Sequence, residues 1–139
     1  MLKKHLKINT DLNVLTQTLG WFDQLKDSGI PQPTWFQCQL VLAEGLTNAI
    51  RHAHKDQPPE VQIELEVKVF AQHLEIRIWD QGNPFDLETR VKALPEKIDT
   101  NNETGRGLKL MQTIADQLTY TRAADHRNCL LITKSWADI

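Results

Sequence analysis

A helical pattern over residues 34–54 constrains the fold more than any other stretch of the chain. Pro33 and Thr34 supply a stop and an N-cap, and no proline follows until Pro58, so about five helical turns fit. Apolar residues recur on one arc of this helix, and we expect that arc to face the core. The arc consists of Trp35, Cys38, Leu42, Leu46, Ala49 and Ala53. The other informative parts of the chain are expected to gather around this helix.

A polar stripe lies roughly opposite that arc. Glu44, Asn48, Arg51 and His52 follow one another at positions i, i+4, i+7 and i+8. Asparagine is unfavourable inside helices because its amide competes for backbone hydrogen bonds, so the presence of Asn48 in the middle of this helix needs an explanation. The stripe alone favours a solvated face. A carboxylate and a carboxamide one turn apart are also what a helix offers to a hydrated magnesium ion and a reacting hydroxyl.

Composition limits the classes of protein. A chain of 139 residues, 40% hydrophobic and 24% charged, suits one soluble domain over residues 1–139. The 16 Lys and Arg against 18 Asp and Glu leave no basic surface of the kind that binds nucleic acid or membranes. Neither a signal peptide nor a membrane-spanning run is visible, so we expect a cytoplasmic protein. Cys38 and Cys129 are expected to be buried thiols.

The rest of the chain predicts an α+β fold. The predicted elements are a lysine-rich edge strand over 2–8, a helix from Thr10 or Asp11 to the Ser28-Gly29 stop, the helix over 34–54, an antiparallel hairpin of strands near 61–69 and 74–78, a helix after Gly105 carrying Leu108, Met111, Ile114 and Leu118, and strands near 119–122 and 129–136. This order indicates a two-layer sandwich, with helices on one face of a mostly antiparallel sheet.

Two glycine motifs flank a long charged stretch. Asp80-x-Gly82 ends the second strand of the hairpin, and alone it is typical of a tight turn. Gly105-x-Gly107 precedes a helix; it could be a flexible entry, or it could leave amides free to bind an anion such as a triphosphate. It is neither a P-loop nor a dinucleotide fingerprint. The stretch 83–104 between the motifs has little apolar periodicity, and we expect it to be a lid.

Taken together and in order, these stretches resemble the GHKL ATPase superfamily. EGLTNAIRHAH is similar to its N box, DQGNPFD to its first glycine box and GRGLKLM to its second. The spacing, the Phe85-Asp86 ending and the short chain favour the small anti-sigma-factor serine/threonine kinases within it. The resemblance implies a Bergerat-type ATP-binding fold that uses ATP and Mg²⁺.

The resemblance also implies roles for individual residues. It makes Glu44 the general base and Asn48 the magnesium ligand. It makes Asp80 the acceptor for the adenine amino group and Gly82 the point of close approach to the base, and it puts Thr133 on the adenine side. The phosphate-binding turn consists of Gly105, Arg106 and Gly107. The chain departs from the family pattern at DHRNCLL, which lacks a glycine before the last strand, and at Asn83-Pro84, which implies a stiffer lid hinge.

The implied function is an ATP-dependent protein serine/threonine kinase that acts as an anti-sigma factor. Such a protein phosphorylates a STAS-type anti-anti-sigma partner, otherwise holds a sigma factor or another regulator, and forms a homodimer. The alternative is a nucleotide-gated regulatory binding protein without significant kinase activity. Glu44 favours the enzyme, because a binder needs no carboxylate beside the phosphates. His52 and His54 are expected to be packing or surface residues rather than phosphoacceptors.

Overall fold

The computed structural model describes residues 2–11, 13–54, 57–82 and 103–137. Its helices are α1 (Val14–Asp23), α2 (Gln32–Asn48), the π-helical turn η1 (Ala49–Ala53) and α4 (Glu103–Ile114). Its strands are β1 (Leu2–Asn9), β2 (Gln62–Val69), β3 (His73–Asp80), β4 (Gln117–Arg122) and β5 (Asn128–Ser135). The predicted lid over 83–104 lies outside the described residues, except that Glu103 and Thr104 already belong to α4.

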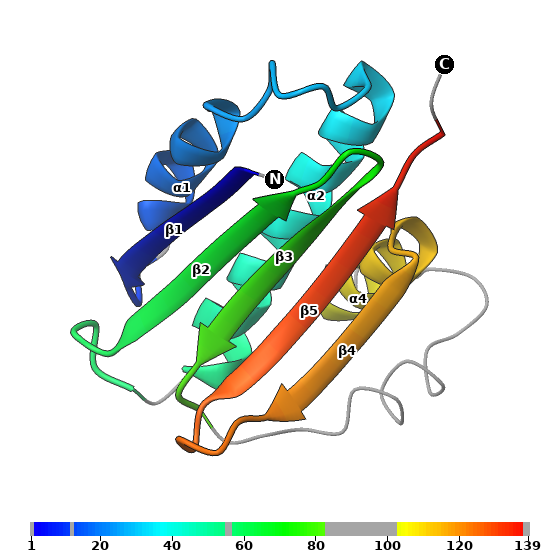
Figure 1. Cartoon of the computed structure of the whole chain (residues 1–139). Helices are drawn as coiled ribbons and strands as arrows, with labels where there is room; N and C mark the ends of the chain where they lie inside the picture. Colours follow the sequence, from blue (N-terminus) through cyan, green and yellow to red (C-terminus); the bar gives the residue numbers. More distant parts are fainter. Residues whose placement is uncertain (1, 12, 55–56, 83–102, 138–139) are drawn as a thin grey trace.

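The strands form one antiparallel sheet in the order β1-β2-β3-β5-β4. Figure 1 shows α1, α2 and α4 behind this sheet, on one face, with the other face turned toward the viewer. The predicted α+β sandwich is therefore confirmed, as is the antiparallel hairpin of β2 and β3. The lysine-rich first strand lies at a sheet edge, as predicted.

The core lies between the helices and the sheet. Alternate residues of β2 and β3 point toward the helices and are at most 4% exposed, as in Ile63, Leu65 and Ile76. The predicted apolar arc of α2 faces them, and Phe22 of α1 stacks on Trp35 of α2 with ring centroids 4.4 Å apart. Arc residues Trp35, Cys38, Leu42, Leu46 and Ala49 are all buried, whereas the side chain of Ala53 lies outside the described residues. None of the described helices is long and apolar enough to cross a membrane.

The two cysteines are free thiols in different surroundings. Cys38 is fully buried, and burial raises the pKa of its thiol to about 12. Cys129 is only half-buried, on the sheet face away from the helices, so the expectation of two buried thiols is correct only for Cys38.

A missing side chain lets α2 lie close to the sheet. A Cβ atom on Gly45 would come within 2.7 Å of Ile78 Cδ1 in β3 and 3.2 Å of Leu130 Cδ2 in β5. Real Cβ atoms do not approach that closely, so a side chain at this position would push the end of the Ile78 side chain aside, and glycine lets the helix pack directly on the sheet.

The long helix differs from its predicted boundaries at both ends. It begins at Gln32 with Pro31 at the N-cap, and Thr34 is a buried residue of the first turn that makes no side-chain cap. Its α-helical part ends at Asn48, and the final turn is π-helical, closed by a 2.9 Å bond from the His54 amide to the Ala49 carbonyl. Such one-turn π segments are frequent at functional sites.

The boundaries of the first helix and of α4 also differ from the prediction, and α1 ends at Asp23 rather than at the Ser28-Gly29 stop. The first helix begins at Val14, and Asp11 accepts a 2.9 Å bond from the Asn13 amide rather than capping the helix directly. Leu118 lies in β4 instead of on α4. After α4 ends at Ile114, the Asp116 amide donates to the Thr133 carbonyl at 2.8 Å, so the chain has already joined the sheet before Leu118.

Candidate functional site

Asp80 is a buried carboxylate at the end of β3, on the face that carries the helices. It is 3% exposed. Its Oδ1 accepts from Asn128 Nδ2 at 2.8 Å and from the Gly82 amide at 3.0 Å, and its Oδ2 accepts from the Tyr120 hydroxyl at 2.9 Å. These donors use three of the roughly four lone-pair positions of a carboxylate. Among the described residues, one position on Oδ2 is left for a further donor.

Asn128 and Tyr120 hold that carboxylate in place. Asn128 is fully buried opposite Asp80 in β5, and its Nδ2 also donates to the Gly82 carbonyl at 2.9 Å. Its Oδ1 accepts from Arg122 at 3.2 Å, so the orientation of the amide is determined. Burial, together with the charge of Asp80, raises the pKa of Tyr120 well above its usual range, which keeps its hydroxyl a neutral donor.

Sequence reasoning missed both of these residues. Asn128 directly precedes the predicted last strand, 129–136, and an asparagine there is ordinary for a turn, so little in the sequence indicated that it is the first residue of β5. Tyr120 had no clear signal either, because a tyrosine in a strand is ordinary.

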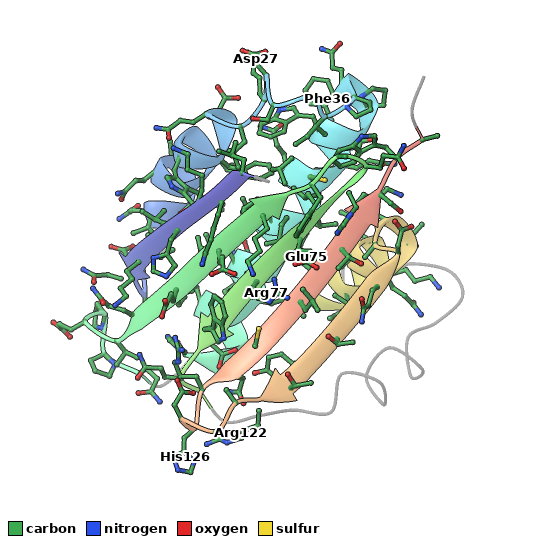
Figure 2. The ribbon with its side chains drawn as sticks, viewed as in Figure 1. Asp27, Phe36, Glu75, Arg77, Arg122 and His126 are labelled. Carbon is green, nitrogen blue, oxygen red and sulfur yellow. The ribbon has the colours of Figure 1, made fainter. Side chains whose placement is uncertain are left out.

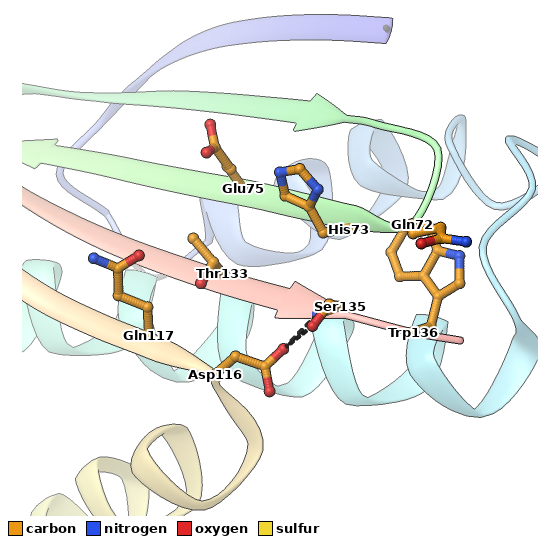
Figure 3. A pocket seen from close by; sticks show the side chains of 8 residues that line it. All are labelled: Gln72, His73, Glu75, Asp116, Gln117, Thr133, Ser135 and Trp136. Carbon is orange, nitrogen blue, oxygen red and sulfur yellow. Dashed lines mark hydrogen bonds between the residues drawn. The ribbon is translucent and has the colours of Figure 1, made fainter. Parts of the chain in front are cut away.

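Thr133 lies elsewhere. It pairs with Glu75, whereas Asp80 pairs with Asn128 at the other end of the same two strands. Thr133 is five positions after Asn128, an odd offset in a strand, so it points to the sheet face away from the helices. There it lines a pocket of about 550 Å³ with Glu75, His73 and Gln117 (Figure 3). The structure therefore does not bring Thr133 to Asp80.

Glu44 and the second glycine motif are in contact. The Glu44 carboxylate lies against the backbone of Gly107 in α4, where a Cβ atom would overlap Oε2. Asn48 follows one turn later on α2, and both side chains are half-buried. The polar stripe is therefore only partly solvated, because α4 covers it at Glu44.

The second glycine motif lies inside a helix rather than before it. Because α4 begins at Glu103, Gly105 falls in the first turn, where amides have no intrahelical partner, and Gly107 falls just beyond it. Amides of this kind bind anions. The side chain of Arg106 lies outside the described residues.

His54 joins the end of the long helix to the end of β3. It is 2% exposed, and burial lowers its pKa, so the ring is neutral. Its Nε2 accepts from the Gln81 amide at 2.7 Å, which leaves Nδ1 to donate to Thr10 Oγ1 at 2.7 Å. The Thr10 hydroxyl donates in turn to the Val61 carbonyl. His54 is thus a packing residue, as predicted, and the side chain of His52 lies outside the described residues.

The site has two ends. The buried carboxylate of Asp80 lies at one end, and Glu44, Asn48 and the start of α4 lie at the other. In the described part of the chain, no group of three or more His, Cys, Asp or Glu residues could hold a metal ion. The single amide oxygen of Asn48 is a donor set that fits Mg²⁺, which keeps several waters and is held partly through substrate phosphates.

A family profile described as a histidine kinase-like ATPase domain matches residues 8–134. The chain therefore belongs to the histidine kinase-like ATPase domain family, and the predicted membership of the GHKL group is confirmed.

Curated relatives of this chain include serine-protein kinases named RsbW. One from Bacillus licheniformis is 35% identical over 85 residues, covering 58% of this chain and 53% of that protein. The one from Staphylococcus epidermidis is 31% identical over 103 residues, covering 70% and 58%. This chain thus matches little more than half the length of either relative.

Two solved structures share the fold. The RsbU and RsbW domains of Rv1364c from Mycobacterium tuberculosis superpose with a TM-score of 0.68 at 12% identity, covering 97% of this chain and 32% of that one. The SiaB–SiaC complex from Pseudomonas aeruginosa gives 0.65 at 10% identity, covering 94% and 88%.

Proposed function

We propose that this chain is an ATP-dependent protein serine/threonine kinase that acts as an anti-sigma factor by partner switching. It phosphorylates a STAS-type anti-anti-sigma protein, and otherwise holds a sigma factor or another regulator inactive. The observation that supports this most is the Glu44 carboxylate lying against Gly107 near the start of α4, with Asn48 one turn away. That arrangement puts a base beside the backbone suited to phosphate, which a nucleotide binder without transfer activity does not need.

Nucleotide recognition is assigned to both ends of the site. The remaining lone pair of Asp80 accepts a hydrogen bond from the adenine amino group, and Gly82 allows the base to lie close to the backbone. Asn128 and Tyr120, in place of Thr133, complete the adenine side. The first turns of α4, with Gly105, Arg106 and Gly107, lie against the phosphates.

The proposed chemistry asks mainly for positioning. Asn48 holds Mg²⁺, which when bound neutralises charge on the phosphate oxygens. Glu44 takes the proton of the acceptor hydroxyl while the hydroxyl oxygen attacks the γ-phosphorus and ADP leaves. In this proposal the stretch 83–104 is a lid over the nucleotide.

The proposed partners rest on the relatives. RsbW proteins are named serine-protein kinases, and SiaB was solved in a complex with SiaC. We carry over a protein partner of the STAS type, a cytoplasmic location and a homodimer. The exposed edge of β1 is available for pairing, and sedimentation at micromolar concentration should show a dimer; a 16 kDa species alone would exclude it.

Labelled ATP tests the function directly. The protein is incubated with Mg-ATP and each STAS-domain protein encoded in the same genome, and calorimetry measures nucleotide affinity in parallel. We expect label on a Ser or Thr of one STAS protein. ATP binding that controls partner binding without any label would instead support the nucleotide-gated binding protein.

A further inference from the structure

Two exposed apolar side chains lie on the same helix as the proposed base. Among the described residues, the exposed large hydrophobic side chains are Phe36 at 54%, Leu40 at 50% and Leu2 at 40%. Phe36 and Leu40 are one turn apart on α2 and continue the stripe that carries Glu44 and Asn48. Single exposed apolar residues are ordinary, but a pair in line with a reacting group is not explained by the fold.

A hollow adjoins this pair. Phe36 lines a pocket of about 340 Å³ between the start of α2 and the connection from α1, with Ile30 and Trp35 as apolar walls. Asp27 lies at the same end of the molecule as Phe36 (Figure 2) and also lines the pocket. The surface thus offers an apolar centre with a charged rim, the composition common at protein interfaces.

The direction of α2 decides what can cover this surface. Toward its C-terminal end the helix leads to Asn48 and η1, and His54 ties that end to Gln81, next to Asp80. The nucleotide side of the site lies in that direction. A protein that presents a hydroxyl to Glu44 is left with the opposite direction, where Leu40 lies about 6 Å and Phe36 about 12 Å away along the helix axis.

We propose that Phe36, Leu40 and the adjoining pocket form the docking surface for the protein whose hydroxyl is phosphorylated. The inference rests on the proposed function and deepens it. It commits the substrate to a stated chemistry: a folded protein with at least one large apolar side chain within about 12 Å of its phosphoacceptor oxygen, the reach set by the helix rise. Buried apolar anchors of this kind supply much of the affinity of protein interfaces.

The test separates docking from chemistry. Phe36→Ser and Leu40→Ser are compared with wild type, using the STAS-domain protein that the wild type labels. We expect the KM for that protein to rise roughly tenfold for each substitution, with kcat and Mg-ATP affinity changed less than about twofold. Leu2→Ser is the matched control, because it removes an exposed apolar side chain far along the sequence, on β1.

Each other outcome overturns the proposal. An unchanged KM in both variants, while Glu44→Gln still lowers transfer, would remove the docking surface and leave the proposed kinase intact. No label from the wild type on any STAS protein would end both proposals. A variant that becomes monomeric while wild type is dimeric would show that this surface joins two copies of the chain.

Discussion

The two ends of the site differ in how completely they are built. At the Asp80 end, the carboxylate is 3% exposed and Asn128 is fully buried, and every contact between them is made within the chain. At the other end, Glu44 and Asn48 are half-buried, and Glu44 rests on a glycine backbone. Recognition of a planar base profits from donors and acceptors held in advance, whereas transfer needs room for a phosphate and a second protein.

The largest effect is expected from a substitution at the Glu44 end of the site. Glu44→Gln keeps the shape of the side chain but cannot accept the proton, so transfer to the partner should fall by about 10² to 10⁴ while ATP affinity barely changes. Single-turnover phosphate transfer and calorimetry measure the two quantities. Asn48→Ala is the companion variant, and it should weaken Mg-ATP binding and transfer together. A wild-type rate in Glu44→Gln would refute the base assignment.

A methyl group at Gly107 should lower phosphate transfer by moving the Glu44 carboxylate, without changing its chemistry. In Gly107→Ala the new Cβ displaces the Glu44 carboxylate, and a misplacement of about 1 Å can lower a rate up to roughly a hundredfold. Gly20→Ala in α1 is the control, because a Cβ atom added there would meet nothing within 4 Å. Equal transfer rates in both variants would show that the Glu44 contact does not matter for transfer.

The Asp80 end of the site is tested by the substitution Asp80→Asn. In this variant a side-chain amide nitrogen would replace one of the carboxylate oxygens that accept hydrogen bonds. Losing one charge-assisted hydrogen bond to adenine should weaken ATP binding about ten- to hundredfold. Calorimetry measures the affinity. Glu75→Gln makes the same chemical change on the same strand but on the opposite face, where Glu75 pairs with Arg77, and it should leave ATP affinity unchanged. Unaltered binding in Asp80→Asn would contradict the adenine assignment.

His54 connects the two ends and predicts a pH dependence of stability. Burial lowers its pKa in the folded protein, so the unfolded chain takes up a proton first, near the ordinary value of about 6.5. The stability it contributes is therefore present above about pH 6.5 and is lost as pH falls toward the folded pKa, by at most about 1.4 kcal/mol per pH unit.

Urea unfolding from pH 8 downward, in whole pH steps, should show this loss in wild type and not in His54→Asn. The control is His126→Asn, since His126 is exposed at φ 67°, a backbone conformation that asparagine tolerates. The same slope in wild type and His54→Asn would assign the pH dependence to other groups.

The smallest effect is expected on the sheet face away from the helices. Glu64 there accepts hydrogen bonds from His5 and Arg127, all three partly exposed. The substitution Glu64→Gln removes both of these partly exposed ion pairs, each worth less than about 1 kcal/mol, and added salt reduces the difference further. Thermal unfolding of Glu64→Gln at low and high salt measures it, and a larger, salt-independent loss would show that this face is more than a charged surface.

Much of the fold could be predicted because its signals are local. Alternation in 61–69 and 74–78 predicted β2 and β3, and the arc on the long helix predicted which residues are buried. The π turn could not be predicted, because it depends on His54 reaching Gln81 and Thr10, which lie far away in sequence.

The sequence by itself determined the period of each element, the order of the three motifs and so the identity of Glu44, Asn48, Asp80 and the glycines as candidates. Only the tertiary structure decided that Asn128 and Tyr120 hold Asp80, that Thr133 faces the other way, and that Phe36 and Leu40 remain uncovered. The physical reason is that periodicity is a property of neighbours along the chain. Strand register and helix crossing come from the packing of the whole domain, here from Gly45 resting on Ile78 and Leu130.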